Sequence, residues 1–283
     1  MPGTDDPREF ETAQTCRVCS GVTKFIFAAN VLGRPTRYFD CPTCGYVQTE
    51  APYWLAQAYG QPIGDADTGI MLRNRANMAR VLVALLALAR LRGRVLDVGG
   101  GYGILVRMLR DIGIDAHWRD KHCENLLAKG FEGDHGSYDL ATAFEVVEHL
   151  EHPLEELRSL MATAPAVLIS TELAPAVGTL TPSWWYLVPE YGQHIGFVRE
   201  STLAWIAREL GCHYATDGLC VHLFVRDRSL ARRWSVLRLL TPVAPKLARF
   251  RVRSRTMTDF EIARKRMRAS LPNQDKQGQR TSP

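Results

Sequence analysis

The sequence contains no long hydrophobic run. Its longest largely apolar stretch, residues 81–91, lies between Arg80 and Arg92 and is shorter than the roughly 20 residues of a membrane-spanning helix. The first ten residues are polar and acidic, unlike the basic and then apolar order of a secretory signal. The composition, 46% hydrophobic and 23% charged, is that of a globular protein. We therefore expect a cytoplasmic protein without a transmembrane segment.

The sequence also lacks the even number of cysteines that a disulfide framework requires. Four of its seven cysteines form two Cys-x-x-Cys pairs that are separated by twenty-one residues. In a reducing compartment this pattern indicates a metal site, and four thiolates at such spacing fit a tetrahedral structural zinc ion in a zinc ribbon. Four such ligands leave no open position for a substrate. The expected zinc ligands are Cys16, Cys19, Cys41 and Cys44, and the alternative is four reduced cysteines that bind nothing.

Charge is not evenly distributed along the chain. The net charge is +5, but residues 229–283 contain 14 Lys and Arg against 3 Asp and Glu, whereas residues 1–228 contain 21 against 27. Basic amphipathic helices are predicted at 231–240 and 259–268. Such a tail could contact an anionic membrane surface, a phosphorylated substrate or nucleic acid. The simpler expectation is a solvated, partly helical extension.

A glycine-rich turn organises the central part of the chain. Residues 94–98 form an apolar strand that contains Asp97, glycines follow at 99, 101 and 103, and apolar residues at helical spacing begin at Ile104. Glycines let the backbone turn sharply and approach a ligand closely. A strand, a glycine turn and a helix are typical of a nucleotide-type cofactor site. The spacing is neither Gly-x-Gly-x-x-Gly nor that of a phosphate-binding P-loop, and a purely structural turn is the alternative.

This turn, Asp-x-Gly-x-Gly-x-Gly, resembles the first motif of class I S-adenosylmethionine (SAM)-dependent methyltransferases. The resemblance implies that SAM is the cofactor, held by close backbone approach and by carboxylates. Asp120 follows a predicted strand at 116–118, where an acid can accept hydrogen bonds from ribose hydroxyls. Glu145 follows a predicted strand at 138–144 and begins a Glu-Val…Glu-His-Leu block, similar to that of small-molecule methyltransferases. The implied cofactor-binding residues are Asp97, Gly99, Gly101, Gly103, Asp120 and Glu145.

The resemblance implies an α/β fold, namely the Rossmann-like, seven-stranded and mostly parallel sheet of class I methyltransferases, preceded by a small zinc ribbon. The third strand is the least evident, because residues 131–136 are short and glycine-rich. The expected organisation is an N-terminal tail and zinc ribbon at 1–50, with residues 1–15 disordered, and a helical connector at 51–93. The methyltransferase domain follows at 94–228 and a basic C-terminal tail at 229–283.

Residues 172–198, called the aromatic loop below, are rich in aromatic residues and proline. A loop of this length without a pattern of its own is usually functional or disordered, and the aromatic content argues against disorder. Its segment 191–197 is similar to the Tyr-x-Glu-His-x-x-Phe/Tyr stretch of zinc-ribbon-bearing sugar C-methyltransferases. There the Tyr, Glu and His handle the proton beside a ketone. Tyr191 and His194 match, and Gln193 replaces the Glu. A neutral amide cannot raise the basicity of an imidazole as a carboxylate would. Methylation of a hydroxyl, with His194 as base and Tyr191 beside it, is therefore at least as plausible as methylation of carbon. A purely structural His194 is the alternative.

The resemblance covers residues 16–225 and lacks the large C-terminal domain of the sugar C-methyltransferases. It predicts methyl transfer from SAM to a small molecule, of the nucleotide-sugar or glycan-precursor type. The sequence has no Asn/Asp-Pro-Pro-Tyr signature, which counts against a nucleic-acid substrate. Two alternatives remain open: an RNA methyltransferase that uses the ribbon and the basic tail, and a non-catalytic binding protein on a methyltransferase frame.

Overall fold

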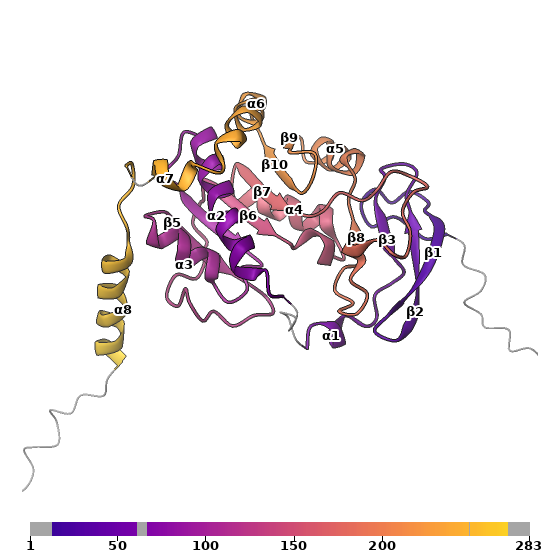
Figure 1. Ribbon diagram of the computed structural model, residues 1–283, viewed down its shortest axis with the longest axis horizontal. Helices are drawn as coiled ribbons and strands as arrows, with labels where there is room; N and C mark the ends of the chain where they lie inside the picture. The colour runs from indigo at the N-terminus through magenta and orange to yellow at the C-terminus, as the bar shows by residue number, and fades with distance from the viewer. Residues whose placement is uncertain (1–12, 61–66, 249, 271–283) are drawn as a thin grey trace, which may run out of the picture.

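A computed structural model describes residues 13–60, 67–248 and 250–270. Two sheets lie side by side along the long axis of the molecule (Figure 1). The expectations for the first twelve residues and for the end of the basic tail concern residues outside the described part of the chain. No helix in the described part is long and apolar enough to cross a bilayer.

The larger sheet has the strand order β5-β4-β6-β7-β10-β9. All neighbouring strands are parallel except that β10 is antiparallel to both β7 and β9. Its central strands are buried along their whole length and mostly apolar, because helices cover both faces of the sheet. The strands are β4 (Arg94–Val98), β5 (Asp115–Arg119), β6 (Leu140–Phe144), β7 (Ala166–Ser170), β9 (His213–Thr216) and β10 (Val221–Val225).

The expected seventh strand is not formed as a strand. The larger sheet has six strands among the described residues, and the segment expected to supply the seventh makes a single parallel bridge, between Trp118 and Glu132. Gly130 and Gly133 flank this bridge, and glycine weakens a strand because it loses more conformational freedom on ordering. The number seven was therefore wrong for this part of the chain. The mixed, mostly parallel sheet preceded by a small antiparallel sheet is confirmed.

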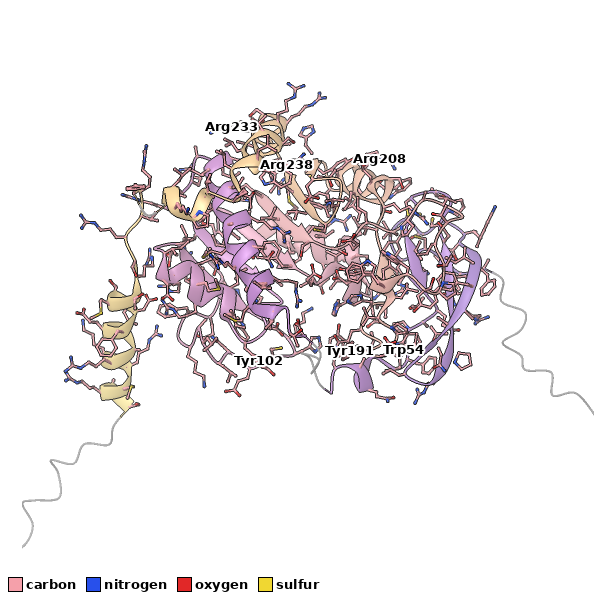
Figure 2. All side chains as sticks on the ribbon, viewed as in Figure 1. Trp54, Tyr102, Tyr191, Arg208, Arg233 and Arg238 are labelled. Atoms are coloured by element: carbon pink, nitrogen blue, oxygen red, sulfur yellow. The ribbon has the colours of Figure 1, made fainter. Side chains whose placement is uncertain are left out.

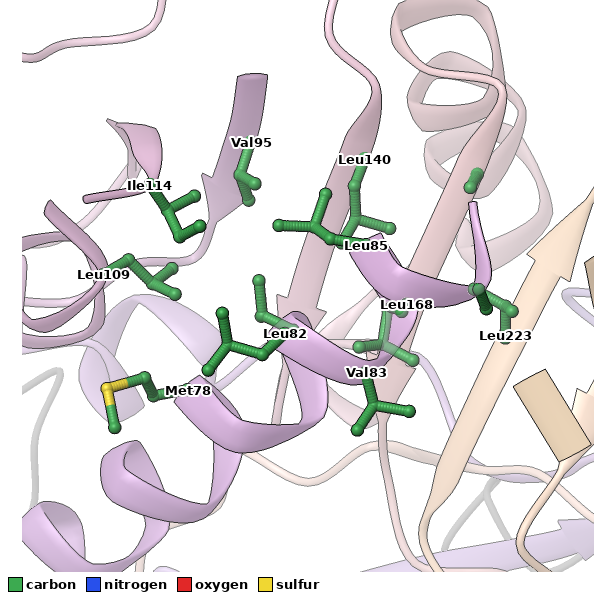
Figure 3. Close-up of a cluster of buried hydrophobic side chains, with 14 of the residues drawn as sticks. Met78, Leu82, Val83, Leu85, Val95, Leu109, Ile114, Leu140, Leu168 and Leu223 are labelled. Atoms are coloured by element: carbon green, nitrogen blue, oxygen red, sulfur yellow. The ribbon is translucent and has the colours of Figure 1, made fainter. Parts of the chain in front are cut away.

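Helices pack against both faces of the larger sheet. One face is covered by α2 (Ile70–Ala87), α3 (Ile104–Asp111) and α6 (Arg228–Leu237), and the other by α4 (Pro153–Thr163) and α5 (Glu200–Glu209). In Figure 3, Leu82 and Leu85 of α2 lie against Leu140 and Leu168 of the strands. A short helix, α1 (Leu55–Ala58), precedes α2. The apolar side chains of α2 thus form the largest part of this core face.

The C-terminal helices are attached to the body of the protein. Trp234 of α6 is 2% exposed and belongs to the same core as α2. Two further helices follow, α7 (Ala244–Ala248) and α8 (Thr256–Ser270). Asp259 of α8 is buried and accepts hydrogen bonds from Arg107 and Arg110 of α3, each at 2.8 Å. The described part of the basic tail is therefore helical, as expected, and packed rather than fully solvated.

The small N-terminal sheet recruits a strand from the aromatic loop. Its order is β1 (Lys24–Val31), β2 (Arg34–Asp40), β3 (Val47–Thr49) and β8 (Gly196–Phe197), all antiparallel. A buried ion pair adds to this link, because Arg199 donates to both carboxylate oxygens of Asp40 at 2.8 and 2.9 Å and to the carbonyl of Gly45. The ribbon and the methyltransferase body therefore share one continuous interface.

Replacing Arg199 with methionine keeps side-chain volume but leaves the Asp40 carboxylate buried without its partner. We expect the free energy of unfolding to fall by about 3–5 kcal/mol, measured by urea denaturation. Lys129→Ala is the control, because Lys129 and Glu124 form an exposed pair and should contribute about 1 kcal/mol or less. Equal stability of the R199M variant and the wild type would contradict this role for the ion pair.

Candidate active site

The glycine turn, residues 99–103, lies between β4 and α3 at the carboxyl edge of the larger sheet. Gly99, Gly101 and Gly103 have φ angles of +68°, +53° and +85°, which L side chains rarely adopt. A Cβ at Gly100 would lie 2.8 Å from Cδ1 of Trp118. The indole of Trp118 also donates a 2.8 Å hydrogen bond to the Gly101 carbonyl. These glycines are therefore required by the shape of the turn, which leaves a cradle open for a cofactor.

Asp97 is the buried acid on the strand before the turn. It is 3% exposed, and the hydroxyl of Thr142 on β6 donates to its Oδ1 at 2.6 Å. Burial raises the pKa of Asp97 to about 7, against the effect of the Thr142 hydrogen bond. The side chain lines the same cavity as the turn. Its contact with a cofactor stays a prediction.

Asp120 follows β5 and faces the turn from the neighbouring strand. Its carboxylate accepts from the backbone N–H groups of Gly101 at 2.9 Å, His122 at 2.7 Å and Cys123 at 2.8 Å. The acid therefore fixes the glycine turn. Each carboxylate oxygen has two acceptor sites, so the three bonds leave one site, on Oδ2, for a ribose hydroxyl. Asp120 lines the cavity, and its role toward ribose stays a prediction.

Glu145 occupies the first position after β6 in a left-handed conformation, with φ +55°. Strained backbone of this kind persists where the surrounding structure fixes it, commonly at functional sites. The Ser170 hydroxyl donates to Oε1 of Glu145 at 2.6 Å, and Tyr186 lies 3.5 Å from Oε2. Glu145 was expected to bind the cofactor. The structure places its carboxylate between β7 and the aromatic loop.

One cavity of about 980 Å³ extends from the glycine turn to the aromatic loop. The labelled side chains of Tyr102 and Tyr191, both in the cavity wall, lie along the same edge of the molecule (Figure 2). Gly103 is a predicted cofactor residue outside the wall, since it caps the start of α3. The predicted site residues in the wall are Asp97, Gly99, Gly101, Asp120, Glu145, Tyr191 and His194.

His194 has a defined proton position. Its Nδ1 lies 2.6 Å from the carbonyl oxygen of Tyr186. A carbonyl oxygen only accepts, so Nδ1 carries the proton and the neutral ring keeps its lone pair on Nε2. Burial lowers the pKa of His194 below its usual value, although the charge of Glu145 acts in the other direction. The imidazole is therefore neutral at neutral pH and can accept a proton.

A second histidine, His149, lies beside His194. The rings of His149 and His194 have centroids 5.0 Å apart, and Nδ1 of His149 lies 3.3 Å from the Tyr59 hydroxyl. Burial and two neighbouring imidazoles lower the pKa of His149 to about 3. Tyr59 also stacks on His122, with centroids 4.1 Å apart. Imidazole and aromatic rings thus form a continuous group in the cavity wall, from His122 through Tyr59 and His149 to His194.

Sequence reasoning left Glu148 and Tyr186 out of the site. The Tyr186 hydroxyl donates to Oε1 of Glu148, whereas Oε2 is buried without a hydrogen-bond partner among the described residues. Burial and the charge of Glu145 raise the pKa of Glu148 to about 8. Glu148, His149 and His194 bring their ligand atoms within 4.8 Å of one another. The Glu-His pair after β6 was a visible signal. Nothing in the sequence marked Tyr186 among the other aromatic residues.

Gln193 has a structural explanation. The residue is buried, and its amide Nε2 donates to the carbonyl oxygen of Ala58 in α1 at 2.9 Å. An ionised glutamate offers only acceptors and could not make this bond. The amide therefore ties the aromatic loop to α1, and the carboxyl group within 4.8 Å of His194 belongs to Glu148, after the end of β6.

The four cysteines of the two Cys-x-x-Cys pairs come together at one end of the small sheet. All four Sγ atoms lie within 4.8 Å of one another, with Cys16 and Cys44 at 3.6 Å and Cys19 and Cys41 at 3.4 Å. A tetrahedral zinc ion with bonds of about 2.3 Å places sulfurs roughly 3.8 Å apart. Backbone N–H groups of residues 18 and 21 point at two of the sulfurs, each at 3.4 Å. The four cysteines are thus positioned to bind a metal ion.

A family model described as a methyltransferase domain matches residues 71–216. No curated protein sequence matches the chain. The chain is similar to magnesium protoporphyrin IX methyltransferase from Synechocystis PCC 6803, solved with bound SAH, at 16% identity and a TM-score of 0.41, over 62% of this chain and 96% of that one. It is also similar to mitomycin 7-O-methyltransferase, at 18% identity and a TM-score of 0.39, over 61% and 60% of the two chains.

The family match begins within α2 and ends with β9. It therefore includes the glycine turn, Asp120, the acids that follow β6 and the aromatic loop. The matched residues make up more than half of the 283 in the chain. The chain belongs to the methyltransferase domain family and is a SAM-dependent methyltransferase.

Proposed function

We propose that the protein transfers the methyl group of SAM to a hydroxyl or carbon of a small sugar-type acceptor, with His194 as the base. The observation that carries this proposal is the orientation of His194. Its Nδ1–H is fixed on the Tyr186 carbonyl, and its ring lines the cavity that contains the glycine turn. The donor supplies an electrophilic methyl group. The residues of this chain must align the acceptor, exclude water and take its proton.

The cavity has the size expected for a cofactor together with a small acceptor. Its volume of about 980 Å³ lies at the upper end of the roughly 300–1,000 Å³ typical of small-molecule sites. Several rings in its wall, among them Tyr59, Trp185 and Tyr191, offer flat apolar faces. Such faces suit the C–H side of a pyranose ring. The sugar class also rests on the resemblance of the ribbon and of residues 191–197 to sugar C-methyltransferases.

The surroundings of His194 support both hydroxyl and carbon acceptors. An alcohol needs a base only as its oxygen attacks, which a neutral imidazole can provide. A carbon beside a ketone needs stronger assistance, and the charge of Glu145 offsets only part of the lowering of the His194 pKa by burial. We propose that Tyr191 lines the acceptor side of the cavity and that Tyr186 and Glu148 position the histidines. Whether the acceptor presents a hydroxyl or a carbon beside a ketone decides which of the two reactions takes place.

The basic residues of the C-terminal helices do not surround the cavity. Arg233 and Arg238 lie on the edge of the molecule opposite Tyr102 and Tyr191 (Figure 2). An enzyme that methylates a nucleic acid needs Lys and Arg for the phosphates close to the edge where methyl transfer occurs. This placement therefore favours a small acceptor over RNA.

We propose that the four cysteines hold a structural zinc ion, which fixes the aromatic loop. Arg17, between Cys16 and Cys19, donates to the carbonyl oxygens of Thr49 and Ile195 at 2.7 and 3.0 Å. Ile195 directly follows His194. A metal at the cysteines would order Arg17 and thereby the backbone next to the base.

Asp120→Ala should weaken SAM binding by about 10- to 100-fold, because carboxylate hydrogen bonds contribute about 1.5–3 kcal/mol each. Calorimetric titration of SAM and of its demethylated product measures this change. Glu124→Ala, which removes an exposed acid of the same loop, should leave the affinity unchanged. Failure of the wild-type protein to bind SAM would overturn the catalytic proposal and support the binding-protein alternative.

His194→Gln should lower kcat by about 10²- to 10⁴-fold while SAM affinity stays within about threefold. The base acts only when neutral, so the wild-type rate should rise with pH through the pKa of His194. Because burial lowers that pKa, the acid limb should lie below about 6.5 and vanish in the variant. The exposed His135→Gln is the control. An unchanged acid limb in the H194Q variant would rule out His194 as the base.

Cys41→Ser should remove one of the four expected zinc ligands and so reduce both thermal stability and activity. We expect one zinc ion per chain in the wild type by elemental analysis, and less than about a tenth of that in the variant. Cys212→Ser, outside the cluster and the cavity, should retain the full zinc content. Wild-type protein without zinc, yet fully active, would show that the cysteines do not serve as a zinc site.

A further inference from the structure

The segment from α6 to the start of α8, residues 228–255, forms a surface that the catalytic proposal does not use. We call this segment the basic ridge. It contains nine Lys and Arg and no Asp or Glu. Among the described residues, Arg232, Arg233, Arg238, Lys246, Arg251 and Arg253 form no ion pair with an acid. Most of this positive charge is therefore available to an external partner.

Large apolar side chains alternate with these charges on the outside of the ridge. Leu239 is 73% exposed, Val236 67%, Leu247 47% and Phe250 86%. Single exposed apolar residues are normal, but a succession of them along one segment marks an interaction surface. Leu240 and Val243 are also exposed and extend the row.

These exposed side chains are not core residues that failed to pack. The ridge already has a buried face, formed by Ala231, Trp234, Ala244, Ala248 and Val252, and this face belongs to the core around α2. The apolar row is therefore a second face, held on the outside by a segment that is anchored from within. One apolar face of the segment is packed on the protein core, and the other is exposed among arginines. Such a segment is suited to the interface between water and the hydrocarbon of a lipid bilayer.

We propose that the basic ridge binds the surface of a lipid bilayer that carries anionic headgroups. Arginine and lysine are attracted to such headgroups, and aliphatic side chains gain from entering the acyl region beneath them. RNA fits less well, because it binds exposed rings by stacking and the apolar row contains one aromatic residue, Phe250. A second copy of the ridge would bring like charges together.

Docking in this orientation leaves the cavity open. Arg233 and Arg238 lie on the opposite edge from Tyr102 and Tyr191 (Figure 2), and no described helix could cross the bilayer. The ridge is therefore a peripheral contact, separate from the proposed reaction. Membrane binding can be tested without any acceptor, and its outcome is independent of the catalytic proposal.

The test is flotation of the full-length protein with vesicles of phosphatidylcholine alone or with about a third of phosphatidylglycerol. We expect binding to the anionic vesicles at low salt and weaker binding as salt rises. Leu247→Ser with Phe250→Ser should weaken it at least about tenfold. Lys246→Gln with Arg251→Gln and Arg253→Gln should weaken it about 10- to 100-fold. The matched control is Val177→Ser with Leu219→Ser, two comparably exposed residues away from the ridge, which should change nothing.

SAM affinity, measured in parallel, reports whether each variant is folded, since none of these residues lines the cavity. The proposal is overturned if the folded wild type does not float with anionic vesicles. It is also overturned if the ridge variants float as well as the control. Loss of RNA binding or of self-association in the ridge variants, with no vesicle binding by the wild type, would assign the ridge to that other partner.

Discussion

The backbone of Ile195 is the contact on which the active site depends. Its N–H donates to the Glu148 carbonyl at 2.8 Å, and its carbonyl accepts from Thr49 of β3 and from Arg17. One residue therefore joins the end of β6, which carries the acids of the site, to the sheet that carries the cysteines. His194 immediately precedes it. Any displacement of the small sheet against the larger one would move the imidazole, so under the proposed function the small sheet helps to position the base.

Titratable side chains are buried on both sides of the cavity. On the side of the glycine turn, burial raises the pKa of Asp97 to about 7, and the neighbouring Asp120 accepts three backbone hydrogen bonds. On the side of the aromatic loop, burial raises the pKa of Glu148 to about 8 and lowers that of His149 to about 3. A proton-bearing acid and a neutral imidazole therefore lie beside His194, where we propose that the acceptor binds. A neutral base in low dielectric suits an uncharged acceptor.

Much of this could be predicted from local sequence. The glycine turn between β4 and α3, the acid that follows β5 and the paired cysteines are all marked by patterns within a few residues of each other. Two other features depend on contacts between segments that are distant in sequence. These are the single bridge formed by the segment expected to supply the seventh strand and the burial of Trp234 against α2. Tyr186 is chosen by its distance from Glu148, across thirty-eight residues of sequence. No local pattern encodes such a pairing, because many aromatic residues of the loop are equivalent in sequence.

Gln193 shows how a departure from a motif can be misread. By position it replaces the carboxylate next to the base, and that loss argues against a strongly basic imidazole. In the fold its amide bonds to α1, and the charge of Glu145 acts on His194 against the larger effect of burial, which lowers the pKa of the imidazole. The strained backbone at Glu145, with φ +55°, turns its carboxylate toward Ser170 and Tyr186. Under the proposed function, the chemistry of His194 must therefore be judged from the groups that surround it in space, where burial lowers its pKa and the charge of Glu145 acts in the other direction.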